Sequence, residues 1–233
     1  MTSRPLLLAV DDPLVDHVSA VIHRPDHHGR QRLPSVLLVP GAGGDLEGAG
    51  LTALAHVIVS AGSIVVRANL PYREAGRRPP RADRSIDSYL AVLAAAQDAV
   101  GDRRPWVLGG KSYGGRVASM AVAEGQEAAG LLFYGYPLHP PGRPTQLRVD
   151  HWPDVDVPTL FLQGERDTYS DPELLATHIR KLPRRATLQV VAGGDHSLRV
   201  AAKHSATGEA ISEEMGVRGC SKVVASWLRG LET

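Results

Sequence analysis

The chain has 233 residues, of which 43% are hydrophobic, so it is large and apolar enough to bury a core and is neither disordered nor fibrous. Its 26 lysines and arginines against 25 acidic residues leave a formal net charge of +1, which gives no bulk attraction to nucleic acid or to a membrane surface. We therefore expect a soluble globular protein with neither a nucleic-acid nor a membrane partner.

Cysteine content and hydropathy indicate the compartment. The one cysteine, Cys220, allows no internal disulfide and no thiolate pair for a metal, and we expect it to be a core residue of the last helix. The apolar run at 6–10 is shorter than the core of an export signal. No run of about 18 apolar residues occurs, so the sequence predicts no membrane-spanning helix. We expect a cytoplasmic protein.

Short apolar runs bounded by glycine or proline alternate with segments of helical period, which is typical of βαβ units around a mostly parallel sheet. In the first half we expect an antiparallel edge strand at 18–23, a strand at 35–39, a helix at 51–61, a strand at 63–66, a loop at 67–84 and a helix at 85–100. In the second half we expect strands at 106–108, 130–134, 159–162 and 187–191, and helices after 114, at 171–182 and at 217–231. We find no internal repeat or linker and expect one domain over 1–233.

Several local signals support these elements. The run 36–39 does not alternate with polar residues, as expected for a strand covered by helices on both faces. Gly101 is a typical C-terminal cap, and Asp171 with Pro172 supplies an N-cap and a first-turn proline.

The segment Gly110-Lys111-Ser112-Tyr113-Gly114 is a G-x-S-x-G motif between an apolar strand and a helix. In this context the serine lies on a strained turn, and the two glycines leave room for the backbone to bend back on itself. The helix N-terminus also favours developing negative charge. Ser112 is therefore our candidate nucleophile, and the alternative is a glycine-rich turn whose serine only caps the helix.

A serine needs a base, and in this arrangement the acid and the base follow the nucleophile at the ends of later strands. Asp167 follows the strand at 159–162, and His196 follows the strand at 187–191. Both belong to the carboxyl edge of the sheet, where open α/β folds bind ligands. We predict that Ser112 is the nucleophile, His196 the general base and Asp167 the carboxylate that orients it.

Other acidic residues and histidines compete less well for these roles. Asp171 fits an N-cap better, Glu165 comes earlier in the same loop, and Asp195 adjoins His196 too closely to bond its ring. The remaining candidate histidines show no metal-ligand spacing and are expected to be solvated or in the core: His27, His28, His56, His178 and His204. We expect no metal and no organic cofactor.

Acyl transfer also needs amide donors for an oxyanion. One is the N–H of Tyr113, and the glycine-rich loop 40–44 supplies a second, for which we choose Ala42. This loop lacks the Walker pattern, and Leu46 occupies the last glycine position of G-x-G-x-x-G, so nucleotide binding is disfavoured. Two arginine-rich loops near this edge fit a solvated surface better than an anion site: Arg73, Arg77, Arg78, Arg81 and Arg84, then Arg143 and Arg148.

Taken together, these segments resemble the α/β-hydrolase superfamily and, within it, the dienelactone-hydrolase-like group that includes NSL-complex subunit 3 and testis-expressed protein 30. The resemblance spans most of the chain and is carried by V-P-G-A-G-G-D at 39–45, L-P-Y-R-E-A-G-R-R-P-P at 70–80, G-G-K-S-Y-G-G-R at 109–116, Y-P-L-H-P-P-G at 136–142, Q-G-E-R-D at 163–167 and G-G-D-H-S at 193–197. It implies an α/β-hydrolase fold with helices on both faces of the sheet and a triad of Ser112, Asp167 and His196.

The chain departs from this pattern in two places. Pro40 stands where a histidine commonly precedes the oxyanion-loop glycine, and no insertion is long enough for a large cap domain, so an open site is implied. The sequence thus predicts a serine hydrolase that cleaves a small ester or other acyl substrate through an acyl-enzyme on Ser112. The alternative is a non-catalytic binding or scaffold protein on the same fold. A dienelactone-type lactone hydrolase would usually carry cysteine at the nucleophile position.

Overall fold

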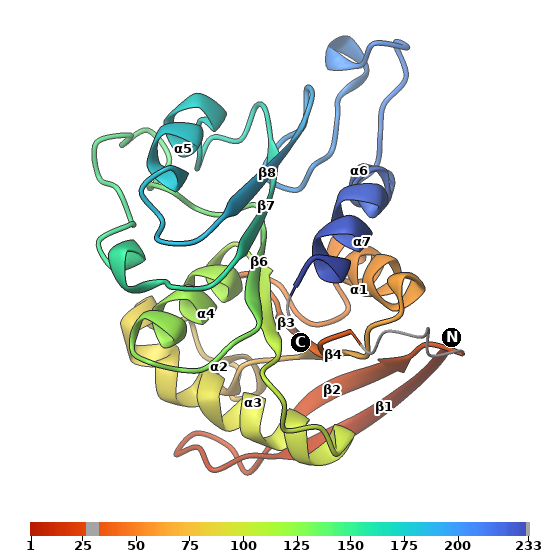
Figure 1. Ribbon diagram of the computed structural model, residues 1–233, viewed down its shortest axis with the longest axis vertical. Helices are drawn as coiled ribbons and strands as arrows, with labels where there is room; N and C mark the ends of the chain where they lie inside the picture. Colours follow the sequence, from red (N-terminus) through yellow and green to blue (C-terminus); the bar gives the residue numbers. More distant parts are fainter. Residues whose placement is uncertain (27–32, 232–233) are drawn as a thin grey trace.

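The computed structural model describes residues 1–26 and 33–231 and is built around an eight-stranded sheet (Figure 1). The strands are β1 (Thr2–Ala9), β2 (His17–Arg24), β3 (Val36–Val39), β4 (Val65–Ala68), β5 (Val107–Lys111), β6 (Gly130–Tyr134), β7 (Thr159–Gly164) and β8 (Ala186–Val191). Their order across the sheet is β1-β2-β4-β3-β5-β6-β7-β8. The strands from β4 to β8 in this order are parallel, whereas β1 pairs with β2 and β2 with β4 in antiparallel register.

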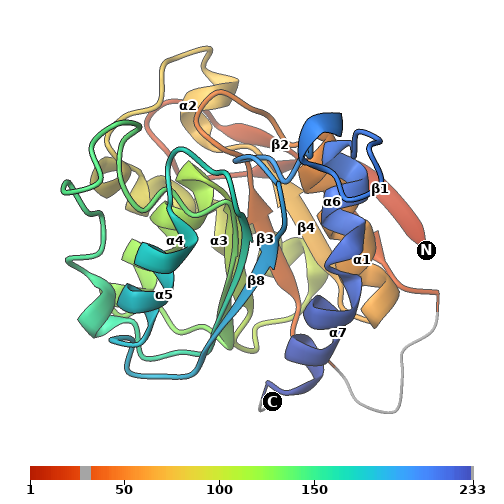
Figure 2. The same ribbon diagram turned by 90° about the horizontal axis from the view of Figure 1, so that it is seen from above.

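Helices cover both faces of this sheet. They are α1 (Ala49–Ala61), α2 (Pro71–Glu74), α3 (Ile86–Val100), α4 (Tyr113–Ala123), α5 (Pro172–Ile179), α6 (Glu213–Gly219) and α7 (Ser221–Arg229). Seen from above, α1, α6 and α7 lie on one face, and α3, α4 and α5 lie on the other (Figure 2). The predicted fold class, a mostly parallel sheet flanked by helices, is confirmed.

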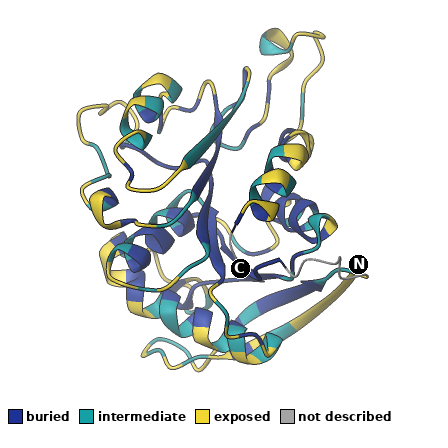
Figure 3. Ribbon diagram, viewed as in Figure 1, coloured by how far each residue is buried: buried dark blue, intermediate teal, exposed yellow. Residues whose placement is uncertain are grey.

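Two hydrophobic cores form because successive side chains of a strand point to opposite faces. Along β3, Val36 and Leu38 pack into the core beneath α1 and α7, whereas Leu37 and Val39 pack into the core beneath α3 and α4. All four are fully buried, and burying each such side chain contributes about 1.5–3 kcal/mol. The central strands are dark blue in Figure 3, the colour of buried residues, whereas the outer strand β1 is largely exposed.

The N-terminal part of the sheet differs from the prediction. The strand expected at 18–23 is present as β2, but it is not at the edge, because β1 pairs with it along its whole length. The sequence predicts no strand before residue 18. A strand exposed on one face carries a weak apolar signal, since Leu8 is buried while its neighbour Leu7 is 67% exposed.

The second parallel strand also ends later than expected. β4 continues through Arg67 to Ala68, and the Arg67 side chain, only 3% exposed, has buried acceptors for Nη1 and Nε. Its Nη1 donates to Thr52 Oγ1 (2.7 Å) and to the Leu46 carbonyl, and its Nε donates to His23 Nε2 (3.0 Å). The expected loop at 67–84 is likewise wrong in part, since it contains α2 and a 3-10 helix, Ala82–Ser85.

The predicted last helix is in fact two helices, and it begins earlier. Ser212 caps α6 by accepting a hydrogen bond from the Met215 N–H (3.2 Å). The helix is interrupted at Cys220, and α7 begins at the next residue. Cys220 is buried as expected, although it lies at the junction of the helices, and burial raises its pKa to about 11. The helix expected at 171–182 is shorter, ending at Ile179.

The described chain has neither a separate cap domain nor a membrane-spanning helix. The segment 135–158 between β6 and β7 contains only a 3-10 turn, Trp152–Asp154, so no separate cap domain is present in the described part of the chain. Among the described residues, no helix has the length and apolar character needed to cross a membrane.

The buried His23 is expected to make the free energy of unfolding sensitive to acid. Its Nε2 accepts from Arg67, so its Nδ1 carries the proton and donates to Ser3 Oγ (2.8 Å). Burial, followed by the charges of Arg67 and His56, lowers the pKa of His23 to about 4 from 6.5. Between these values the unfolded chain binds the proton and the folded chain does not, so the free energy of unfolding is expected to fall as the pH drops from 6.5 to 4, by up to about 3 kcal/mol.

Urea unfolding of the wild type and of His23→Gln at pH 7, 5.5 and 4 measures this effect. Glutamine retains an acceptor for Arg67 but does not titrate, so the variant is expected to lose less stability between pH 7 and pH 4 than the wild type. Parallel stability curves for the two proteins would contradict this origin of the acid sensitivity.

Candidate active site

The turn after β5 has the strained geometry expected of G-x-S-x-G. Ser112 lies at φ 50°, ψ −110°, between β5 and the first residue of α4. Its N–H donates to the Tyr134 carbonyl (2.9 Å), which fixes the turn against β6. A Cβ at Gly110 would collide with the Val39 backbone, and one at Gly114 would collide with the Val39 side chain and carbonyl. Only glycine therefore allows this approach to β3 at both positions.

Three predicted residues meet at the carboxyl edge of the sheet. His196 Nε2 lies 2.9 Å from Ser112 Oγ, and His196 Nδ1 lies 2.7 Å from Asp167 Oδ2. The Asp167 side chain is fully buried, whereas the imidazole is 22% exposed. His196 is 84 positions from Ser112 and 29 positions from Asp167 in the sequence. The three side chains nevertheless form one continuous series of hydrogen bonds that ends at the serine hydroxyl.

The Asp167 carboxylate is held from both sides. Gln163 Nε2 donates to Oδ2, the oxygen that faces His196, and the Tyr169 N–H donates to Oδ1 (2.8 Å). Gln163 is itself oriented by its Oε1, which accepts from the Tyr136 N–H (3.0 Å). The Tyr169 ring packs on the imidazole, with ring centroids 4.4 Å apart and planes tilted by 32°. Sequence reasoning missed this role of Gln163, because its burial and its contact with Asp167 appear only in the structure.

The competing carboxylates have other partners. Asp171 caps α5 by accepting from the N–H groups of Glu173 and Leu174 (2.9 Å each). Glu165 accepts from the Gly193 N–H (2.7 Å) and so ties the two loops together. Asp195 accepts from the Ser197 and Arg199 N–H groups (2.8 and 3.0 Å), which shapes the turn that carries His196. The assignment of Asp171 as an N-cap is confirmed.

The glycine-rich loop after β3 lies against the serine. Ala42 and Tyr113 line the same cavity as Ser112, and within the described chain neither N–H donates a hydrogen bond. Tyr72 on α2 anchors the loop by donating from its hydroxyl to the Ala42 carbonyl (3.3 Å). Arg73 adds an ion pair with Asp45 (3.5 Å). The 70–80 segment thus positions the loop at 40–44.

The cavity beside Ser112 has a volume of about 750 Å³ and is open to solvent. Its walls come from the loop at 40–44, the segment 79–83, the start of α4 and the loops that carry Tyr169 and His196. Across residues 1–26 and 33–231, no three His, Cys, Asp or Glu side chains are grouped as metal ligands would be.

A polar network beside the serine links three parts of the chain. Lys111 Nζ donates to Ser197 Oγ and to Glu213 Oε1 (2.7 Å each), which joins the end of β5 to the His196 loop and to α6. Tyr134 donates its hydroxyl to Glu213 Oε1 (2.6 Å), and burial raises its pKa. No sequence signal pointed to Glu213, because it is 102 residues from Lys111.

Replacing Lys111 by methionine tests this network. The change leaves Glu213 without its cation and frees Ser197, so we expect a loss of about 1–2 kcal/mol in the free energy of unfolding and a several-fold lower kcat on an activated ester. Adding Glu213→Gln is expected to restore part of the stability. The control is Lys222→Met on the exposed side of α7, and equal losses for the two lysines would contradict the role of Lys111.

The loop arginines and the other histidines named in the sequence analysis differ in how far they are exposed. Arg77, Arg78, Arg84 and Arg143 are exposed, as expected for solvated loops. Arg81 is 82% exposed and pairs with Asp83, whereas Arg148 is half-buried at the cavity, contrary to a purely solvated loop. His56 lies on α1 and His178 on α5, each partly buried, and His204 is partly buried in a 3-10 turn. His27 and His28 lie outside the described residues.

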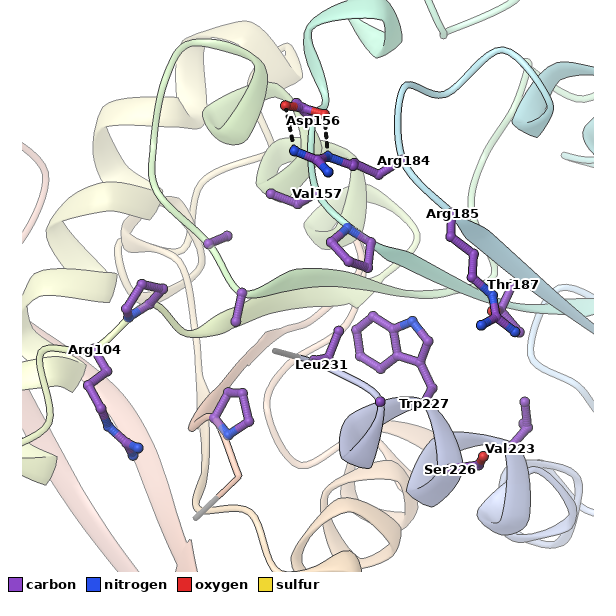
Figure 4. A pocket seen from close by; sticks show the side chains of 16 residues that line it. Arg104, Asp156, Val157, Arg184, Arg185, Thr187, Val223, Ser226, Trp227 and Leu231 are labelled. Carbon is purple, nitrogen blue, oxygen red and sulfur yellow. Dashed lines mark hydrogen bonds and ion pairs between the residues drawn. The ribbon is translucent and has the colours of Figure 1, made fainter. Parts of the chain in front are cut away.

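A second hollow, of about 860 Å³, lies at the opposite edge of the sheet (Figure 4). Pro34, Pro105 and Pro158, which precede β3, β5 and β7, line it together with Trp227. The Arg184–Asp156 ion pair (2.7 Å) also borders it. None of Ser112, Asp167 and His196 reaches this hollow, so its larger volume does not make it the candidate active site.

Solved structures of other proteins share this fold, including proteins described as serine hydrolases. An α/β serine hydrolase homologue from Coxiella burnetii superposes with a TM-score of 0.71 at 17% identity and covers 97% of both chains. A serine hydrolase without a lid from Xanthomonas campestris has a TM-score of 0.66 at 18% identity and covers 99% of this chain and 96% of its own. A dienelactone hydrolase from Anabaena variabilis has a TM-score of 0.65 at 18% identity, covering 100% and 99%.

The parallel sheet and the strained serine turn define an α/β-hydrolase fold. The family model described as an alpha/beta hydrolase domain matches residues 32–224. The chain belongs to this α/β-hydrolase family.

Proposed function

We propose that the protein is a serine esterase that cleaves a small ester or related acyl substrate through an acyl-enzyme on Ser112. The observation that carries the proposal is the hydrogen-bonded chain from Ser112 Oγ through His196 to the buried Asp167, which opens onto the cavity of about 750 Å³. A serine hydroxyl that faces an oriented imidazole is the arrangement that nucleophilic catalysis requires.

In the proposed reaction, Ser112 Oγ attacks the ester carbonyl carbon while His196 Nε2 accepts the hydroxyl proton. Asp167 keeps the proton of His196 on Nδ1 and stabilises the imidazolium. The N–H groups of Ala42 and Tyr113 bind the oxyanion, since both border the cavity with no other acceptor in the described chain. His196 then returns its proton to the leaving alcohol, whose bond to the carbonyl carbon breaks.

Deacylation repeats these steps with water. His196 removes a proton from the water molecule, which attacks the acyl carbon, and the bond to Ser112 Oγ breaks as the serine regains its proton. The acid is released and the free enzyme is restored. The open cavity favours a small or surface-exposed acyl group, because the described segment between β6 and β7 forms no separate cap domain.

A fluorophosphonate probe tests the proposal directly. We expect stoichiometric labelling of Ser112 in the native protein, identified by peptide mass, and a burst with a short-chain activated ester. His196→Ala is expected to lose the labelling, and His178→Ala, on the distant helix α5, is expected to keep it. Absence of labelling in correctly folded wild type would exclude an activated serine and favour a non-catalytic binding protein on this fold.

A further inference from the structure

Two arginines at the cavity have no charge partner. Arg116 lies on α4, and Arg148 comes from the segment between β6 and β7; both line the cavity beside Ser112. Within residues 1–26 and 33–231, neither guanidinium is in an ion pair or donates a hydrogen bond. The Nε of Arg116 is buried and has no acceptor, although an unsatisfied buried donor is unfavourable.

The other charges that line the cavity are already balanced. Asp45 pairs with Arg73 (3.5 Å), Asp83 pairs with Arg81 (3.3 Å), and Glu213 pairs with Lys111 (2.7 Å). Each acidic side chain of the cavity wall therefore forms an ion pair with a cation other than Arg116 or Arg148. Arg116 and Arg148 add two positive charges that remain available to a ligand.

The two guanidinium groups are close enough to affect each other. Burial and then the charge of Arg116 lower the pKa of Arg148. Holding two like charges together at a partly buried wall is unfavourable, and a bound anion would relieve both the repulsion and the loss of hydration. Exposed arginines such as Arg77 and Arg143 have no such environment.

The arginine pair and Ser112 line the same cavity. The Arg116 N–H donates to the Ser112 carbonyl (3.1 Å), so Arg116 follows Ser112 by four residues, about 6 Å along the helix axis. Arg148 interacts electrostatically with Tyr169, whose ring packs on His196. Because the arginine pair and Ser112 line one cavity, a ligand bound there is able to contact both.

We propose that Arg116 and Arg148 bind an oxyanion group, a carboxylate or a phosphate, at the far end of the acyl group of the substrate. This inference rests on the proposed esterase function and specifies its substrate class. Guanidinium groups match the geometry of carboxylate and phosphate oxygens with paired donors. An anion on the acyl side stays beside α4 in both half-reactions, whereas one on the alcohol leaves after the first.

Three 4-nitrophenyl esters with the same chain length test this proposal: the hexanoate, the adipate monoester with a terminal carboxylate, and the 5-phosphonopentanoate. We expect kcat/KM for one or both anionic esters to exceed that for hexanoate by about tenfold or more, as charge-assisted hydrogen bonds provide. The more active anionic ester identifies the carboxylate or the phosphate as the recognised group. Rates with Ser112→Ala supply the uncatalysed background.

The matched variants are Arg116→Gln, Arg148→Gln and Arg143→Gln, the last an exposed arginine from the same loop as Arg148. The ratio of anionic to neutral kcat/KM is expected to approach one in the first two and to stay at the wild-type value in Arg143→Gln. If Arg116→Gln does not fold, as judged by thermal melting, Arg116→Lys is used, and its loss of paired donors is expected to lower the ratio.

The outcomes separate the two proposals. Hydrolysis of hexanoate by the wild type with no preference for the anionic esters would overturn the anion site and leave the esterase intact. A preference that survives both arginine substitutions would also overturn the assignment to this pair. Absence of hydrolysis of all three esters, together with no fluorophosphonate labelling of Ser112, would overturn the esterase proposal and with it this inference.

Discussion

Ser112→Ala is expected to lower kcat for ester hydrolysis on the order of 10⁴-fold or more, because the acyl-enzyme can no longer form. His196 and Asp167 remain hydrogen-bonded to each other (2.7 Å), and the Ala42 and Tyr113 amides are untouched, so any remaining rate comes from binding and polarisation of the carbonyl. Initial rates with a 4-nitrophenyl ester, measured at matched protein concentration, supply the comparison. A variant that keeps a tenth of the wild-type rate would rule out Ser112 as the nucleophile.

The backbone strain at Ser112 gives a second prediction, which concerns the free energy of unfolding and not the reaction rate. At φ 50° a side chain costs about 1–3 kcal/mol, and glycine avoids most of this cost. Ser112→Gly is therefore expected to be as inactive as Ser112→Ala but more stable by about 1 kcal/mol in urea unfolding. Equal stability of the two variants would mean that the turn relaxes when the serine is lost.

Asp167→Asn is expected to lower kcat on the order of 10⁴-fold while the protein stays folded. The two Asp167 oxygens accept from Gln163 and His196 on one side and from the Tyr169 N–H on the other. An asparagine amide placed toward His196 would donate to Nδ1 and force the ring proton onto Nε2, facing Ser112. In the opposite orientation, the asparagine NH₂ group would face the Tyr169 N–H, and two donors would meet without an acceptor.

Steady-state rates and fluorophosphonate labelling of Asp167→Asn measure this effect, with Asp195→Asn as the control. Among the described residues, the Asp195 carboxylate accepts from the N–H groups of its own turn and from the Arg199 side chain, so its substitution is expected to cost far less activity. If Asp195→Asn proved the more damaging change, the orienting carboxylate would have been assigned to the wrong residue.

Much of this site was predictable from short-range signals. The G-x-S-x-G motif, a carboxylate after one strand and a histidine after the next were enough to select Ser112, Asp167 and His196, because the order of parallel strands brings such loops to one edge. The structure joins them at 2.9 and 2.7 Å. The same reasoning missed Gln163, Tyr169 and Glu213, whose roles depend on neighbours that no local pattern specifies.

The fold class, most of the central strands and the three candidate residues follow from local sequence patterns, because hydrophobic period and glycine placement act over a few neighbouring residues. Three features needed the folded structure: β1 is the outer strand of the sheet, Arg67 is buried inside β4, and Arg116 and Arg148 have no charge partner among the described residues. Whether a charged side chain is exposed, paired or available to a ligand depends on groups distant in the chain, and composition and spacing contain no record of those contacts.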